Sequence, residues 1–111
     1  MTARTLQWAL DELSKNRKVG IASVVSTAGS VPGKEGARLA LTKFSVCGTV
    51  GGAGLEMKVI SRLKELMIES TKPCGEMITH GLNKGAKGYE VTPLDSLCGG
   101  RVTVALEIMI P

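Results

Sequence analysis

The spacing of hydrophobic positions predicts two helices. Near the N-terminus, apolar side chains recur every three or four residues, and Thr2 or Thr5 can cap a helix that ends near residues 16–18. Its expected buried face consists of Leu6, Ala9, Leu10 and Leu13. The second helix follows "GTVGGAGLE" (48–56) and ends before Pro73. Its apolar stripe consists of Leu55, Val59, Ile60, Leu63, Leu66 and Met67.

Continuous or alternating apolar runs predict strands. "VGIASVVST" (19–27) is rich in β-branched residues and nearly continuous in apolar ones, which is typical of a strand buried on both faces. "AGSVPGKEG" (28–36) is expected to be a loop. Shorter strands are expected at 37–42, 44–50, 75–82 and 88–91. In the final segment the alternation predicts a half-buried strand, with inward positions Val102, Val104, Leu106, Ile108 and Ile110.

This order of elements favours the α/β class. We expect a single domain over residues 1–111, with a mixed β-sheet and two main helices packed on it. The helix between the strands at 44–50 and 75–82 favours parallel pairing of those two strands.

Composition narrows the classes of partner. The net charge of +4 comes from scattered Lys and Arg, and Trp8, Phe44 and Tyr89 are the only aromatic residues, so we expect no nucleic-acid partner. The apolar runs are shorter than a membrane span, so we expect no membrane partner either. Three widely separated cysteines argue for a reducing compartment, and we expect a cytoplasmic protein.

Glycines cluster directly before the second helix, in residues 48–56. Bare N–H groups at a helix N-terminus attract phosphates, yet this loop matches neither the dinucleotide nor the P-loop pattern. Judged alone, the loop favours a structural turn, in which the glycines supply positive φ angles and close packing. Glu56, in the first helical turn, is favoured there electrostatically under either interpretation.

Two further glycine-rich loops carry reactive side chains. "STAGSVPGKEGAR" (26–38) has hydroxyls and cations that suit a phosphate, and it also suits an ordinary surface loop. In "LCGGR" (97–101), Cys98 is either an activated thiol or a small buried residue. Cys47 is expected in the core and Cys74 in a structural role, and their spacing with His80 does not favour a zinc site.

Together the three loops resemble the N-terminal domain of the xanthine dehydrogenase accessory factor family (XdhC/CoxI). That family has a strand ending in Ser-Thr-x-Gly-Ser-x-Pro followed by Gly-Ala-Arg/Lys, then a glycine turn closing in Leu/Val-Glu, then Cys-Gly-Gly before a terminal strand. The matching residues in this chain are Ser26, Thr27, Gly29, Ser30, Pro32, Gly36, Ala37 and Arg38; Gly48, Gly51, Gly52, Leu55 and Glu56; and Cys98, Gly99 and Gly100.

The resemblance implies an accessory protein rather than an enzyme. Such a protein binds molybdopterin, the molybdenum cofactor, as cargo, assists its sulfuration and delivers it to a molybdenum hydroxylase apo-enzyme. The implied cofactor-binding residues are Ser26, Thr27, Gly29, Ser30, Arg38, Gly51, Gly52, Glu56, Cys98, Gly99 and Gly100. Cys98 is also the candidate sulfur carrier or contact to the molybdenum of the cargo.

Two other functions stay open. One is sulfur transfer through Cys98 with a cysteine desulfurase as partner, and the other is docking to a separate Rossmann-domain protein, with homo-oligomerisation also open. Longer relatives continue into a Rossmann-type C-terminal domain, which we expect to be absent here. Gly33 stands where many relatives carry Arg, and Ala53 where some carry Cys.

Overall fold

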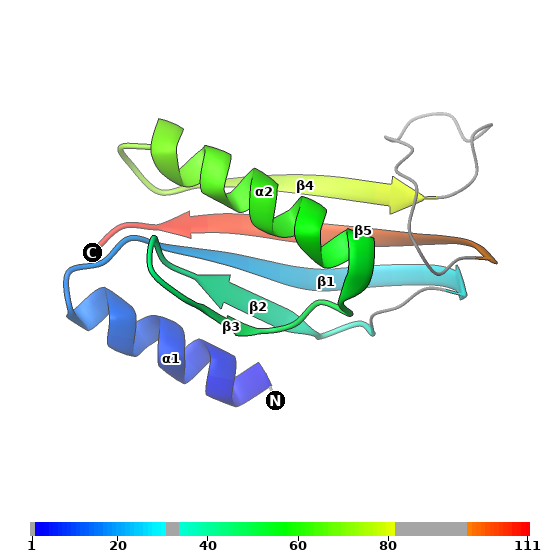
Figure 1. Cartoon of the computed structure of the whole chain (residues 1–111), viewed down its shortest axis with the longest axis horizontal. Coiled ribbons are helices and arrows are strands. Elements are labelled where there is room, and N and C mark those ends of the chain that lie inside the picture. The colour runs from blue at the N-terminus through cyan, green and yellow to red at the C-terminus, as the bar shows by residue number, and fades with distance from the viewer. Residues whose placement is uncertain (1, 31–33, 82–97) are drawn as a thin grey trace.

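The fold is one antiparallel sheet between two helices. The computed structural model describes residues 2–30, 34–81 and 98–111. Its elements are α1 (Thr2–Ser14), β1 (Val19–Ser30), β2 (Arg38–Leu41), β3 (Val46–Gly48), α2 (Ala53–Glu69), β4 (Cys74–Gly81) and β5 (Cys98–Met109) (Figure 1). The strand order is β3-β2-β1-β5-β4. The predicted class, a sheet with two helices packed on it, is therefore confirmed.

The expected parallel pair is wrong. All four strand pairings of the described residues are antiparallel, and β3 and β4 lie at opposite edges of the sheet. The reason is that β1 and β5 occupy the centre and pair from Val19↔Met109 to Ser30↔Cys98. Helix α2 therefore carries the chain across the whole sheet instead of between neighbouring strands.

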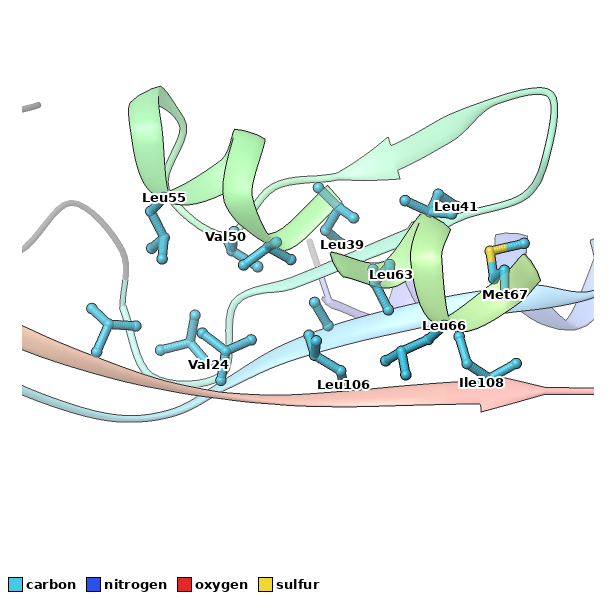
Figure 2. Close-up of a cluster of buried hydrophobic side chains, with 14 residues drawn as sticks. Val24, Leu39, Leu41, Val50, Leu55, Leu63, Leu66, Met67, Leu106 and Ile108 are labelled. Carbon is cyan, nitrogen blue, oxygen red and sulfur yellow. The ribbon is translucent and has the colours of Figure 1, made fainter. Parts of the chain in front are cut away.

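The main core lies between α2 and the sheet (Figure 2). The predicted stripe of α2 is buried, with Ile60 partly so, and β5 alternates as expected. Each fully buried Leu or Val contributes about 1.5–3 kcal/mol. Gly20 of β1 lets the helix approach closely, since a Cβ there would lie 3.2 Å from Leu63 Cδ2 and 3.3 Å from Met67 Sδ.

Helix α1 packs on the other face, but rotated from the expected orientation. Ala9 joins Val19, Ile21 and Ala40 in a second cluster. Leu6 and Leu10, which were predicted to be buried, are 37% and 59% exposed. Their place is taken by Thr5, 2% exposed, and Glu12, 4% exposed. Small residues let α1 approach the sheet closely, and Glu12 is tolerated because cations neutralise its charge.

Strand β1 is less buried and longer than predicted. Residues 19–22 are buried where both helices cover them, but Val25 is 45% exposed, at an irregularity in the pairing between Val24 and Ser26. Residues 28–30, expected in a loop, continue the strand. The strand expected at 88–91 lies outside the described residues. Within the described ranges, neither helix is long and apolar enough to span a membrane.

Candidate functional site

Two of the three glycine-rich motifs meet at one end of the sheet. Ser30, in the first motif, is the register partner of both Cys98 and Gly99, in the third. Gly29 has φ 73°, a conformation that favours glycine and coincides with a register shift between Ala28 and Ser30. The irregular end of the β1–β5 pair, which we call the Ser30–Cys98 end, therefore gathers residues that are far apart in the sequence.

The glycine turn of the remaining motif is closed by the protein's own carboxylate. Gly52 is the N-cap of α2, and the N–H groups of Val50 and Gly52 each donate to Glu56 Oε1 at 3.1 Å. The Thr49 hydroxyl donates to the same oxygen and accepts from the Gly51 N–H at 3.1 Å. Glu56 thus occupies the anion position that the sequence left open for a phosphate.

Positive φ angles explain the glycines of this turn. Gly48, Gly51 and Gly52 have φ values of 86°, 127° and 75°. A Cβ on Gly48 would also collide with the Arg38 carbonyl oxygen and lie 2.7 Å from Thr5 Oγ1. The turn therefore depends on glycine for its backbone conformation as well as for close packing.

The sheet separates some of the predicted site residues. Arg38 Nε donates to Ser23 Oγ at 3.0 Å, on the face where Ile21 meets α1. Ser26 pairs with Thr103, two positions along β5 from the partner of Ser23, and therefore shares that face. Thr27 pairs with Val102 and faces α2.

The other predicted residues fall into two groups. At the start of α2, which lies over the half of the sheet leading to the Ser30–Cys98 end (Figure 1), are Gly51, Gly52 and Glu56. At the Ser30–Cys98 end itself are Gly29, Ser30, Cys98, Gly99 and Gly100.

The remaining cysteines and the histidine lie on the two edge strands, Cys47 on β3 and both Cys74 and His80 on β4. Cys47 is only partly buried, in edge strand β3, so the expectation that it belongs to the core is wrong. Cys74 is exposed, with its Sγ 3.0 Å from Ser70 Oγ. His80 is 5% exposed and pairs with Val102. In the part of the chain that the structure describes, no three His, Cys, Asp or Glu residues gather into a metal site.

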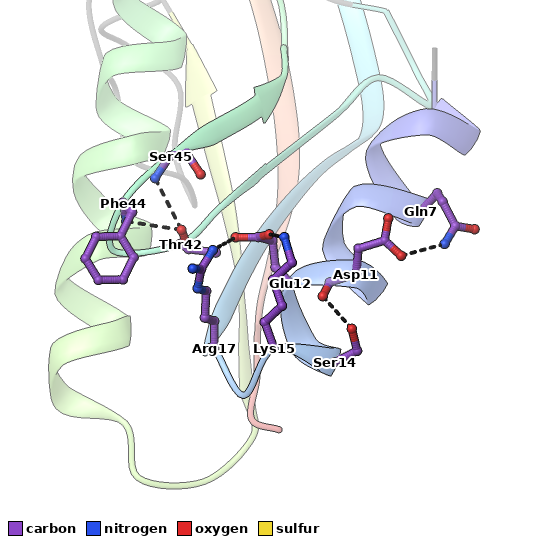
Figure 3. A network of polar contacts seen from close by, with 9 residues as sticks. All are labelled: Gln7, Asp11, Glu12, Ser14, Lys15, Arg17, Thr42, Phe44 and Ser45. Atoms are coloured by element: carbon purple, nitrogen blue, oxygen red, sulfur yellow. Dashed lines mark hydrogen bonds and ion pairs between the residues drawn. The ribbon is translucent and has the colours of Figure 1, made fainter.

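Two carboxyl groups are held ionised by cations. Glu12 accepts from Arg17 at 2.7 Å and Lys15 at 3.2 Å, and the Arg17 hydrogen bond is the main cause of its lowered pKa (Figure 3). Glu76 of β4 takes two hydrogen bonds of 2.7 Å from Arg62 of α2, which lower the pKa of Glu76 and raise that of Arg62.

A concave surface that sequence reasoning missed lies at the opposite end of the sheet. The α1–β1 turn, the β2–β3 turn and the last turns of α2 form a groove with a volume of about 510 Å³. Its walls include Phe44 and Ile68, which are 72% and 86% exposed. The available signal was Phe44 itself, a large aromatic side chain at the start of the strand expected at 44–50, directly after the Lys43 that separates it from the strand expected at 37–42.

The comparisons with known proteins agree with the motif analysis. The family model described as "XdhC and CoxI family" matches residues 12–80. This match includes the first two motifs and ends before Cys98. No curated protein and no solved structure matches significantly. Because the matched segment spans more than half of the 111 residues, the chain belongs to the XdhC and CoxI family.

Proposed function

We propose that this protein is an accessory factor that matures molybdenum hydroxylases of the xanthine or CO dehydrogenase type. Membership of the XdhC and CoxI family suggests such a role in maturation. The finer part of the proposal is that the protein binds molybdopterin as cargo for sulfuration and insertion into the apo-enzyme, and that the Ser30–Cys98 end is the binding site.

The observation that carries this proposal is the pairing of Ser30 with Cys98 and Gly99. It brings Ser30 of the first motif next to Cys98 and Gly99 of the third motif at one end of the sheet. Glycines admit a flat ligand close to the backbone, a hydroxyl both donates and accepts hydrogen bonds, and a thiolate is a soft ligand suited to molybdenum or sulfur. This combination fits the chemistry of a molybdopterin dithiolene.

The cargo's phosphate fits the glycine turn less well. Val50 and Gly52 already donate their N–H groups to Glu56, so a phosphate would have to displace a carboxylate tethered four residues away. We therefore assign Gly51, Gly52 and Glu56 to shaping the start of α2. Arg101, paired with Ala28 and three positions from Cys98 in β5, supplies positive charge nearer the proposed site.

The experiment compares Cys98→Ala with Cys74→Ala, a matched control because Cys74 starts β4 and is exposed. Titration with molybdopterin, followed by its fluorescence, should show about tenfold weaker binding for Cys98→Ala, equivalent to about 1.4 kcal/mol. Maturation of an apo-hydroxylase should fail with the Cys98→Ala protein and succeed with the Cys74→Ala protein. Unchanged affinity and full maturation by Cys98→Ala would overturn the role of Cys98. A persulfide on Cys98 after incubation with a cysteine desulfurase and cysteine would instead favour sulfur transfer.

Exposed side chains on α1 favour docking as a second candidate function. Leu6 and Leu10 lie one turn apart on α1 and are 37% and 59% exposed, whereas Ala9 is buried against the sheet. Such paired apolar side chains suit an interface with a separate Rossmann-domain protein. Replacing both by Ser should abolish co-purification with that protein while leaving molybdopterin binding intact. Loss of molybdopterin binding in the double variant would argue against separate docking and cargo sites.

A further inference from the structure

The β2–β3 turn presents an exposed aromatic ring on a rigid support. Thr42, only 2% exposed, accepts hydrogen bonds at its Oγ1 from the N–H groups of Phe44 at 3.1 Å and Ser45 at 3.2 Å (Figure 3). The Thr42 N–H also donates to the Ser45 carbonyl at 2.9 Å. The backbone of this turn is therefore fixed, while Phe44 remains 72% exposed. A turn whose backbone is already held costs less entropy to order when a partner packs against its side chain.

Two other elements complete a groove beside this ring. Met67 and Ile68, in the last turns of α2, contribute further apolar surface. Asn16, with φ 65°, reverses the chain after α1. The Asn16 N–H donates to the Leu13 carbonyl and the Arg17 N–H to the Glu12 carbonyl, a pattern that commonly ends a helix. The volume of this groove, about 510 Å³, lies within the usual range of ligand sites.

Among the residues that the structure describes, all the charged side chains that line this groove are cationic. Arg17 and Lys18 are anchored, Arg17 to Glu12 and Lys18 through its Nζ to the carbonyl oxygens of Met67 at 2.7 Å and Ser70 at 2.6 Å. Lys43 and Lys64 also line it. The Arg17 guanidinium carbon and the Lys43 Nζ lie 5.5 and 5.9 Å from the centroid of the Phe44 ring. The groove therefore combines an apolar centre with a positive surround.

We propose that this groove binds an acidic segment of a partner protein. One apolar side chain of that segment packs between Phe44 and Ile68, and its carboxylates pair with Lys43 and Lys64. An apolar centre with a polar rim is the usual anatomy of a protein interface, and a rigid exposed aromatic is a typical anchor. A small anion fits less well, because the cations lie on long side chains around apolar surface.

The groove and the Ser30–Cys98 end lie at opposite ends of β1. The β1–β5 pair runs from Val19↔Met109 beside the groove to Ser30↔Cys98, which corresponds to roughly 35 Å at the usual strand rise. In Figure 1 the end of α1, the β2–β3 turn and the end of α2 gather at one end of the sheet. A partner segment can therefore occupy the groove without touching the proposed cargo site.

The test uses two synthetic peptides and the full chain. One is a fluorescein-labelled dodecapeptide in which Asp and Glu alternate with Leu and Phe, and the other carries Lys at every acidic position. Fluorescence polarisation at low salt should show at least tenfold tighter binding of the acidic peptide, with the preference falling as salt rises. Equal binding of the two peptides, or no binding of either, would overturn the proposal.

Variants connect the binding to the groove. Phe44→Ala should weaken the acidic peptide about tenfold, and Lys43→Glu with Lys64→Glu should abolish its preference. Met77→Ala and Lys58→Glu are matched controls, because both alter exposed side chains outside the groove. If the controls weaken binding as much as the groove variants, the site lies elsewhere. Tighter binding of a single-stranded oligonucleotide than of the acidic peptide, lost in Phe44→Ala, would overturn the protein partner in favour of a nucleic acid.

Discussion

The two helices bury their inner faces in different ways. α2 packs large aliphatic side chains, among them Leu55, Val59 and Leu63, into one continuous core. α1 contacts the sheet through Thr5 and Ala9, and it buries a carboxylate, Glu12, where a hydrophobic residue was expected. The stability of the α2 face should thus depend on apolar volume, and that of the α1 face on close approach and on pairing of charge. Four changes test this difference.

Truncation of the α2 core should have the largest effect. Leu63 is fully buried against the sheet, so Leu63→Ala should lower the free energy of unfolding by about 2–5 kcal/mol. Leu10→Ala on α1, a matched change at a 59% exposed position, should cost less than about 0.5 kcal/mol. Urea denaturation followed by circular dichroism measures both. Equal losses would mean that α1 buries its leucines as the sequence pattern first suggested.

Enlarging Gly20 should disturb the α2 face by the opposite route. A valine there would press against Leu63 and Met67, and overpacking of this kind costs about 1–3 kcal/mol. Gly20→Ala should cost less, because the two nearest atoms are the ends of flexible side chains. Thermal unfolding of both variants checks this order. A valine variant as stable as the native protein would show that α2 can move away from β1 freely.

Removing the carboxylate that closes the glycine turn should have a smaller effect, local to the start of α2. Glu56→Ala leaves the N–H groups of Val50 and Gly52 without their acceptor, which should cost about 1 kcal/mol. Glu56→Gln keeps an acceptor oxygen and should lose less. Hydrogen exchange of the Gly52 amide provides a local readout. No faster exchange in the alanine variant would show that the glycine backbone alone closes the turn.

Lowering the pH should weaken the charged pairs of both helices. The pKa values of Glu12 and Glu76 lie below 4.5, so on acidification the unfolded chain takes up protons before these two groups do. Their stabilising contribution is therefore complete above about pH 4.5 and is lost as the pH falls through their lowered folded-state values. Urea midpoints measured from pH 6 to 3 should fall less steeply in Glu12→Gln. Parallel curves for variant and native protein would count against the pairing of Glu12.

The difference between the helices also explains what the sequence could predict. The stripe of α2 and the alternation of β5 follow from local periodicity and survive in the fold. The buried face of α1 does not follow from local periodicity. Glu12 can be buried because Lys15 and Arg17 pair with it, and Arg17 reaches it only after the helix has ended and the chain has turned back. The predicted parallel pairing of β3 with β4 is wrong because β2, β1 and β5 lie between these two strands, and β5 is distant in sequence.

The candidate site was predictable in its residues but not in its geometry. Motif spacing identifies Ser30 and Cys98, yet only the register of β1 with β5 makes them neighbours. Likewise, the position of Glu56 in the first turn indicates a favourable charge, while its acceptance of two backbone N–H groups depends on the positive φ angles of the glycines. The groove beside Phe44 has no sequence motif, because three separate segments form it.

The central strand pair has a consequence for how the chain folds during synthesis. Val19 and Met109 are partners although they lie 90 positions apart, so β1 must wait for nearly the whole described chain to leave the ribosome. Until then one long edge of β1 has open backbone groups that a strand of another molecule can pair with. Contacts of such long range also slow folding. In a nascent chain of this topology, that edge of β1 therefore stays open to pairing with other strands until β5 has been made.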